Sequence, residues 1–328
     1  MRYRRLGDTD INISEVGFGV WTVSTGWWGE VEEARSVRLL RLAHERGINY
    51  FDTADTYGSG LGETLLADAF GHMRDEVVIS TKIGYDFYNH TARRGQQERP
   101  QDWSEDFIRF ALEQSLKRLG ADYVDFLQLH NTKMDAIEND ALFSLMEEFE
   151  VEGKIRAYGV ALGPKIGWLE EGVRAMRERN VAGVQMIHNL LEQDPGRELL
   201  DVARETGTRM IVRVPHSSGM LEGNLTADTV FPENDHRRHR PRSWLVEGVQ
   251  KVDRLGFLTR EMTLGQAALR WLLADPAIIS TLPNIYDTAQ LEEFAAASDV
   301  PDLTEDELRR CEDLYAANFG LATAEVVR

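Results

Sequence analysis

Cysteine and long apolar runs are nearly absent from this sequence of 328 residues. The single cysteine, Cys311, can form neither an intramolecular disulfide nor a thiolate metal cluster. No run of about 18 apolar residues is available to span a bilayer, and residues 1–6 are too charged for the apolar core of a secretory signal. These absences predict a cytoplasmic protein without a membrane span or a disulfide framework.

Basic residues are also scarce. Lysine and arginine together number 37 against 55 acidic residues, which gives a formal net charge of −18 at pH 7. Nucleic acids and anionic membranes both require a basic face, so we expect neither as a partner. The one basic cluster, within 237–242, lies in a loop-like stretch. We interpret it as a solvated or lid-like run of charge in preference to a phosphate site.

Eight short apolar runs are spaced along the chain. They are nearly continuous and do not alternate with polar residues, which is typical of parallel strands buried on both faces. The predicted strands are 16–20, 48–51, 77–81, 124–129, 157–161, 183–187, 210–214 and 278–282.

Eight helical patterns alternate with these runs, and several are followed by a glycine such as Gly47 or Gly120. Eight successive βα units predict an α/β fold of the closed (β/α)8 TIM-barrel type, in one domain covering 1–328. A doubly wound sheet is disfavoured, because the segment 17–21 (GFGVW) lacks the third glycine of a dinucleotide fingerprint. The predicted helices are 32–45, 62–70, 104–119, 139–150, 164–179, 197–205, 244–255 and 263–273.

Polar residues follow the second, third and fourth predicted strands: Asp52 and Tyr57, then Lys82, then His130. The carboxyl ends of all strands of such a barrel meet at one rim, where active sites are built. The sequence therefore predicts that a carboxylate, a phenol, an amine and an imidazole converge.

Carbonyl reduction would give each of these groups a role. Hydride arriving at a carbonyl carbon builds negative charge on the oxygen, which needs a proton donor. A free phenol has a pKa of about 10, so an ammonium group such as Lys82 beside Tyr57 would favour the phenolate form. Asp52 would hold and neutralise Lys82, and His130 would donate a second hydrogen bond to the carbonyl.

The segments 47–57, 107–125 and 127–130 resemble signatures of the aldo-keto reductases, and the resemblance covers nearly the whole chain. It is a resemblance to the bacterial branch, which is related to the potassium-channel β subunits. It implies that Asp52, Tyr57, Lys82 and His130 form the catalytic tetrad. It also implies that the N-terminal hairpin around 3–14 plugs the barrel bottom, and that an extra helix follows the barrel.

The resemblance further implies a nicotinamide cofactor, NAD(H) or NADP(H). Gln185 matches a carboxamide-binding glutamine, whereas Ala161-Leu162 replaces the usual Ser-Asn pair. Arg213 stands where the family presents an aromatic ring to the nicotinamide. A guanidinium can stack on a flat ring, although the cationic oxidised ring would repel it. Contact with the pyrophosphate or with an anionic substrate is the alternative role for Arg213.

Two further segments resemble cofactor-binding parts of the family. Gly219, Leu221 and Gly223 match a loop that folds over the pyrophosphate, although an ordinary glycine-rich turn explains them equally well. The adenosine-phosphate segment contains no basic residue, and Asp287 adds a negative charge, which favours NAD over NADP. The predicted contacts in this segment are Asn284, Tyr286, Gln290 and Glu293.

Aromatic residues follow the first and third strands. Trp21, Trp28 and Tyr85, together with His130, are predicted to line the substrate pocket. The substrate class is a small-molecule carbonyl or alcohol, and the protein is expected as a monomer or a homo-oligomer.

Two other functions are consistent with parts of the pattern. A cofactor-binding regulatory or sensor protein of the same fold would show little turnover, although the complete tetrad argues against a loss of chemistry. A barrel isomerase or metal hydrolase would need a cluster of metal ligands, and His130 has no suitably placed second histidine. We therefore expect no metal.

Overall fold

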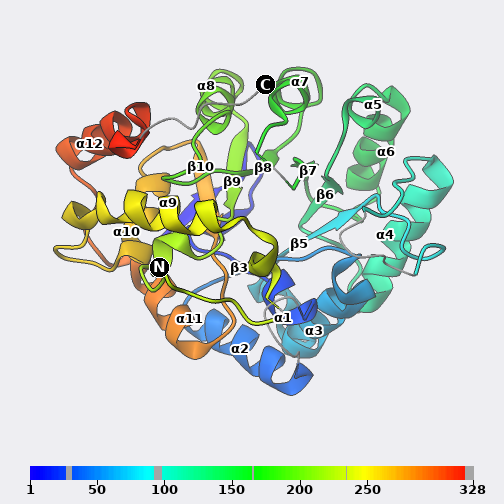
Figure 1. The fold of residues 1–328 in the computed structure, drawn as a ribbon. Coiled ribbons are helices and arrows are strands. Elements are labelled where there is room, and N and C mark those ends of the chain that lie inside the picture. The colour runs from blue at the N-terminus through cyan, green and yellow to red at the C-terminus, as the bar shows by residue number, and fades with distance from the viewer. Residues whose placement is uncertain (27–31, 92–97, 165, 234, 322–328) are drawn as a thin grey trace.

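The centre of the molecule is a curled sheet of eight parallel strands (Figure 1). The computed structural model describes residues 1–26, 32–91, 98–164, 166–233 and 235–321. Each strand pairs with the next along the chain, and a parallel bridge between Val16 and Thr281 joins the two edges of the sheet. This confirms the predicted (β/α)8 barrel. The strands are β3 (Phe18–Gly19), β4 (Tyr50–Asp52), β5 (Val78–Ile83), β6 (Phe126–His130), β7 (Tyr158–Ala161), β8 (Gly183–Ile187), β9 (Arg209–Arg213) and β10 (Ile278–Leu282).

Helices cover the outside of the barrel (Figure 1). They pack there because their apolar faces meet strands that are buried along almost their whole length. The principal helices are α2 (Glu33–Glu45), α3 (Leu61–Phe70), α4 (Glu105–Leu119), α6 (Asp140–Val151), α7 (Leu169–Glu178), α8 (Gly196–Thr206), α9 (Arg242–Asp253), α10 (Leu264–Leu273) and α11 (Thr288–Ala295).

Two helices start more than one residue away from the predicted position. The helix expected at 164–179 begins at Leu169, because Gly167 (φ 132°) and Trp168 (φ 67°) have positive φ values that a right-handed helix does not allow. The helix expected at 244–255 begins two residues early, at Arg242, because it starts directly after the extended Pro241. Both differences are due to the backbone conformation of the residues just before the helix, which helical periodicity does not indicate.

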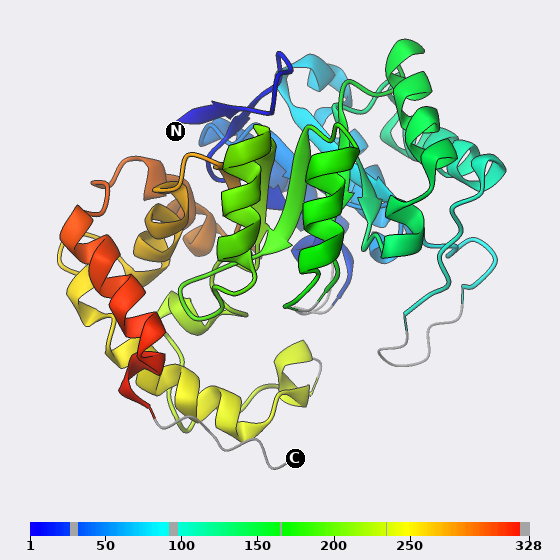
Figure 2. The ribbon, with the colours of Figure 1, turned by 90° about the horizontal axis from the view of Figure 1, so that it is seen from above.

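The N-terminal hairpin closes one end of the barrel and leaves the other end for the site. Strands β1 (Tyr3–Arg5) and β2 (Asn12–Ser14) pair antiparallel. Figure 2 shows this hairpin at the end of the barrel opposite to α9. The carboxyl ends of the barrel strands therefore open toward α9. The apolar cluster beneath the hairpin includes Leu6, Ile11, Ile13, Tyr50, Phe126 and Ile211.

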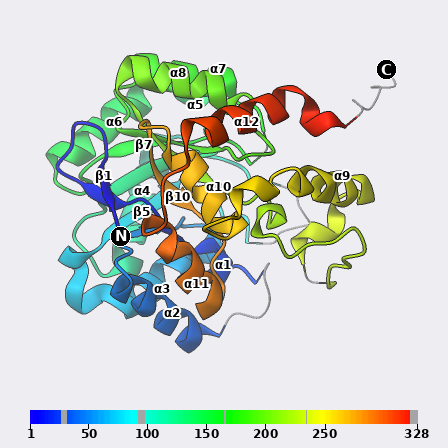
Figure 3. The ribbon, with the colours of Figure 1, turned by 90° about the vertical axis from the view of Figure 1, so that its left-hand side faces the viewer.

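The expected extra helix is α12 (Glu305–Ala316), which lies on the outside of the barrel near α10 (Figure 3). A capping box between Thr304 and Glu307 starts it. The Tyr315 hydroxyl accepts hydrogen bonds from Gln193 N and Asp194 N, both at 3.2 Å, and so ties α12 to the loop after β8. Within the described ranges, no helix is long and apolar enough to cross a membrane.

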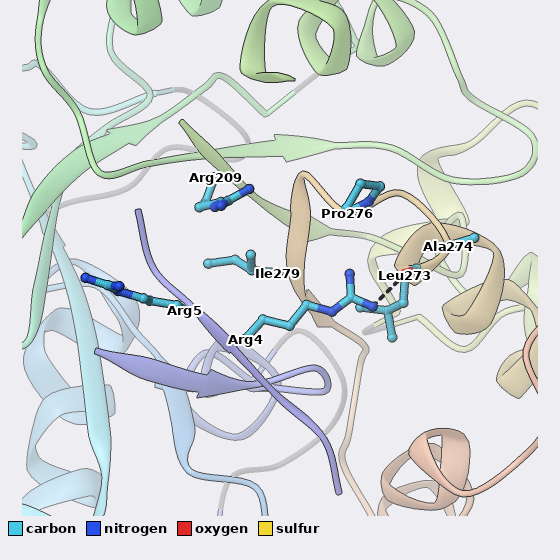
Figure 4. A pocket seen from close by; sticks show the side chains of 7 residues that line it. All are labelled: Arg4, Arg5, Arg209, Leu273, Ala274, Pro276 and Ile279. Carbon is cyan, nitrogen blue, oxygen red and sulfur yellow. Dashed lines mark hydrogen bonds between the residues drawn. The ribbon is translucent and has the colours of Figure 1, made fainter. Parts of the chain in front are cut away.

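A hollow of about 420 Å³ lies at the hairpin end of the barrel (Figure 4). Arg4 donates there to Leu273 O at 2.7 Å and Ile278 O at 2.8 Å, and it pairs with Glu15 at 2.7 Å. Because these bonds fasten the hairpin to the barrel, we assign the hollow a structural role, away from the polar rim. Its lining residues are Arg4, Arg5, Arg209, Leu273, Ala274, Pro276 and Ile279.

Candidate active site

Two buried charges meet at the carboxyl ends of β4 and β5. Lys82 Nζ lies 2.6 Å from Asp52 Oδ1, and the two side chains are 1% and 5% exposed. Lys82 Nζ also donates to Thr53 O at 2.7 Å. A buried ion pair is stable only where its remaining polar atoms are also satisfied, so the surroundings of Asp52 decide whether this pair persists.

The second oxygen of Asp52 is satisfied by three further strands. Asp52 Oδ2 accepts from Ser80 Oγ at 3.2 Å, from Gln128 Nε2 at 3.0 Å and from Gln185 Nε2 at 2.9 Å. Ser80 and Gln128 were not predicted as site residues. Each lies two positions before a tetrad member, Lys82 or His130, so strand periodicity places it on the same face and could have indicated it.

Tyr57 stands above this charge pair. Lys82 Nζ lies 5.2 Å from the centre of the Tyr57 ring. Tyr57 is half-buried and begins a turn in which Gly58 has φ 59°, where an added Cβ would lie 2.3 Å from Ser24 O. Only glycine fits there, so the turn that presents the phenol is closely packed against α1 (Trp21–Ser24).

His130 is a buried neutral imidazole at the end of β6. Burial, followed by the charges of Lys82 and Arg213, holds the pKa of His130 well below its usual value. Its ring makes edge contacts with Tyr57 at 5.7 Å and Tyr85 at 5.0 Å between ring centres. The structure therefore brings all four predicted tetrad residues to one place, with His130 in the state that donates one hydrogen bond.

The predicted substrate residues are placed unequally. Tyr85 lies against His130, with its hydroxyl bonded to Glu98 and to Asn131 Nδ2. Burial, followed by the hydrogen bond to Glu98, raises the pKa of Tyr85, so this phenol stays neutral. Trp21 is half-buried in α1, directly after β3. Trp28 lies outside the described residues.

Gln185 and Arg213 both reach the rim, and both are engaged by the protein. The Gln185 amide nitrogen is committed to Asp52, which leaves its Oε1 as the acceptor for a ligand. Arg213 Nη2 donates to Leu162 O at 2.9 Å and to Gly163 O at 2.5 Å. Arg213 thus binds the end of β7, the segment in which the expected Ser-Asn pair is missing.

The glycine loop after β9 is covered by arginines from the basic cluster. Gly219 (φ 91°) and Gly223 (φ 77°) flank a 3₁₀ turn, Met220–Glu222. Arg237 Nη1 donates to Ser218 O at 3.4 Å, and a Cβ added to Gly219 would lie 2.8 Å from that nitrogen. Leu221 is fully buried, and its backbone N–H donates to His216 O at 3.0 Å, so it holds the turn together. This geometry agrees with the lid-like interpretation of the basic cluster.

The predicted adenosine-site residues lie at the carboxyl end of β10 and on α11. Asn284 and Tyr286 are half-buried there. Gln290 is fully committed, since its Oε1 accepts from Tyr286 N at 3.1 Å and its Nε2 donates to Glu222 Oε2 at 3.3 Å. Glu293 Oε1 accepts from Thr263 Oγ1 at 2.5 Å. These bonds make Gln290 and Glu293 part of the framework of this end.

Glu222 is a member of the site that the sequence did not reveal. Burial raises the pKa of Glu222 to about 7, and its Oε1 is buried without a hydrogen-bond partner. A glutamate within a glycine loop gives no periodic signal, so only the fold shows that it faces Gln290 of α11. Among the residues described, no group of three potential metal ligands is present.

Comparisons with known proteins cover almost the whole chain. The model of the Aldo/keto reductase family matches residues 15–316. The uncharacterized oxidoreductase YqkF of Bacillus subtilis is 30% identical over 328 residues, covering 97% of this chain and 99% of the relative. A probable voltage-gated potassium channel subunit beta of Oryza sativa is 27% identical, covering 92% of each chain. The holo form of an aldo-keto reductase from Bacillus halodurans matches with a TM-score of 0.76 at 26% identity, covering 96% of each chain.

Proposed function

The chain belongs to the aldo/keto reductase family, and from that premise we propose that it interconverts a small-molecule aldehyde or ketone and the corresponding alcohol, with Tyr57 as general acid and base. The observation that carries the proposal is the buried Asp52–Lys82 pair, 2.6 Å apart, beneath the Tyr57 ring. A phenol beside an ammonium group is suited to giving up and regaining a proton.

In the reductive direction, Tyr57 gives its phenolic proton to the substrate oxygen as hydride reaches the adjacent carbon. The Lys82 ammonium stabilises the phenolate that remains, and Asp52 holds the lysine in position through their 2.6 Å contact. Neutral His130 donates a hydrogen bond to the same oxygen and orients the carbonyl. A positioned general acid of this kind contributes roughly 10²–10⁴-fold to the rate.

The residues at the rim fit a nicotinamide cofactor, which would supply the hydride. Gln185 Oε1 is placed to accept from a carboxamide N–H group, because its amide nitrogen is held by Asp52. The N–H groups of residues 219–222 donate to backbone carbonyl groups of the same turn, so Gly223 N is the backbone donor of this loop that is proposed to face a pyrophosphate. An added Cβ at Gly219 would meet Arg237 Nη1 at 2.8 Å, so glycine there allows Arg237 to pack on the loop.

The cofactor that we propose is NAD(H). No side chain at Asn284, Tyr286 or Gln290 is basic, and the acidic Glu222 faces the same region through Gln290. Arg237 is bound by Asp235 through several hydrogen bonds, which offset its charge. A carboxylate suits ribose hydroxyls and repels a 2′-phosphate.

A cofactor-binding regulatory protein is the second candidate. The similarity to a relative named as a potassium channel subunit favours it. The complete set of Asp52, Tyr57, Lys82 and His130 favours turnover instead.

Titration of the purified protein with NADH and with NADPH, followed through nicotinamide fluorescence, tests the proposal. Consumption of the cofactor is then measured with a panel of aldehydes, ketones and keto-sugars. Binding with turnover supports the reductase, whereas binding without turnover on any carbonyl would favour the regulatory candidate. Tighter binding of NADPH would contradict the preference for NAD(H), and no binding of either would contradict the nicotinamide site.

A further inference from the structure

Arg213 is a cation of the active site without a carboxylate partner. Its Nη2 is bound by the carbonyl oxygens of Leu162 and Gly163, and its Nε is buried without a hydrogen-bond partner. No ion pair joins Arg213 to an acid within the described part of the chain. The dipoles of two carbonyl groups fix the guanidinium in place, but they do not cancel its full positive charge.

The neighbours of Arg213 are the reacting groups. Its charge is one of the influences that lower the pKa of His130, after burial and Lys82. It also interacts electrostatically with Tyr57, Asp52 and Tyr85. Because Lys82 already balances Asp52 at 2.6 Å, Asp52 does not offset the charge of Arg213 beside the place where a carbonyl and a nicotinamide ring would meet.

We infer that Arg213 is a specificity-determining residue that discriminates between the oxidation states of the cofactor; this rests on the proposed nicotinamide site. The reduced ring is neutral, whereas the oxidised ring carries a positive charge. Two positive charges a few ångströms apart repel, and salt screens buried groups only weakly. The site therefore binds NADH more tightly than NAD⁺ and raises the midpoint potential of the bound cofactor.

An aromatic residue at the same position would act in the opposite sense. The face of an aromatic ring attracts a cation, so a ring here would stabilise the oxidised nicotinamide. The replacement of a ring by Arg213 thus alters the relative affinity for the two cofactor forms without altering the tetrad. The predicted measurable effect is a change in a ratio of dissociation constants, which needs no knowledge of the substrate.

The test measures dissociation constants for NADH and NAD⁺ by fluorescence and calorimetry in the full-length protein and its variants. Arg213→Met and Arg213→Gln remove the charge, and Arg213→Lys keeps it. The matched control is Arg209→Met, at the far end of the same strand β9, which changes the net charge equally. Thermal denaturation of each variant checks that the barrel stays folded, and Arg213→Gln keeps a hydrogen-bond donor for the carbonyl groups of 162–163.

The expected result is a Kd ratio of NAD⁺ to NADH that falls about ten-fold in Arg213→Met and Arg213→Gln and stays unchanged in the Lys variant and the Arg209 control. For a two-electron couple, this corresponds to about 30 mV in the midpoint potential of the bound cofactor. An unchanged ratio in both neutral variants would overturn the inference. If the Kd ratio is unchanged and only the KM for an anionic carbonyl substrate rises, the inference is also overturned, and Arg213 is a substrate-binding residue. If the unmutated protein binds neither NADH nor NAD⁺, the proposed function itself is overturned.

Discussion

Asp52 and Glu222 are both acids at the rim of the barrel, and the fold satisfies them to very different degrees. Both oxygens of Asp52 are bound: Oδ1 faces Lys82 at 2.6 Å, and Oδ2 accepts from Ser80, Gln128 and Gln185. These donors come from three different strands of the barrel. Asp52 is therefore fixed by side chains of the barrel strands.

Glu222 lies on a loop and has much less support. One oxygen accepts from Gln290 Nε2 at 3.3 Å, and the other is buried without a hydrogen-bond partner. Burial raises the pKa of Glu222 to about 7, against the opposing charge of Arg237. The contrast separates two tasks. The strands fix the groups proposed for proton transfer, whereas the loops proposed to select a cofactor retain a polar atom that the protein does not satisfy, as is common at functional sites.

The largest expected effect tests the proton transfer that we assign to the group around Asp52. Tyr57→Phe removes the proposed proton donor while keeping the ring, so kcat for carbonyl reduction should fall by roughly 10²–10⁴-fold. The Kd for the cofactor should stay within about two-fold, because no strand donor is altered. The matched control is Tyr158→Phe, whose hydroxyl donates to Arg179 O at 3.2 Å elsewhere in the barrel. Full activity in Tyr57→Phe would refute the mechanism.

Asp52→Asn tests how much the barrel depends on its buried charge pair. The substitution leaves the Lys82 ammonium buried without a counter-charge, which costs about 3–5 kcal/mol of unfolding free energy in comparable cases. Denaturation in urea measures the loss. Asp125→Asn breaks another buried ion pair, with Arg74 at 2.7 Å. This variant is the control: it should lower the unfolding free energy without lowering kcat. A stable Asp52→Asn protein would contradict the dependence of the barrel on this ion pair.

The strand framework could be predicted from the sequence, and much of the loop chemistry could not. Continuous apolar runs ending in Asp52, Lys82 and His130 place these residues at one rim, because parallel barrel strands share a direction. The sequence does not report which side-chain bonds form. Gln290, for example, stays a predicted cofactor contact, and it also bonds with Tyr286 N and Glu222 in a way that no sequence pattern indicates. Glu222 lies in a turn set by two positive φ angles and carries no periodic signal.

Glu222→Gln should have the opposite sign to Asp52→Asn. Because the folded-state pKa of Glu222, about 7, is above its ordinary value of about 4.5, the stability associated with its protonated form is lost as pH rises from about 4.5 through 7. The variant should therefore be about 2 kcal/mol more stable than the parent at pH 8, and the difference should nearly vanish at pH 5. Urea denaturation at both pH values measures it. Equal destabilisation at both would show that the carboxylate is satisfied.

The same variant sharpens the assignment of cofactor preference. Removing the charge of Glu222 should lower the Kd for NADPH relative to NADH by about ten-fold, equivalent to about 1.4 kcal/mol. Glu292→Gln, on the exposed side of α11, changes the net charge equally and should leave the ratio alone. If Glu222→Gln leaves the ratio of the Kd values for NADPH and NADH unchanged, other residues of the rim select the cofactor.

His188 gives the smallest expected effect and sets a scale for burial alone, because it lies outside the tetrad. It is 2% exposed, its Nδ1 has no hydrogen-bond partner, and burial lowers its pKa to about 4. On acidification the unfolded chain takes up the proton first, so unfolding free energy is lost from about pH 6.5 down to about 4.

The substitution His188→Asn removes this titration. Between pH 7.5 and 5.5 the variant should lose about 1 kcal/mol less stability than the parent. Taking the difference between the two proteins cancels the opposite contribution of Glu222. Equal loss of stability in the parent and the variant would mean that His188 binds a proton in the folded protein as readily as in the unfolded chain. Burial would then be too weak an effect to explain the raised pKa of Glu222.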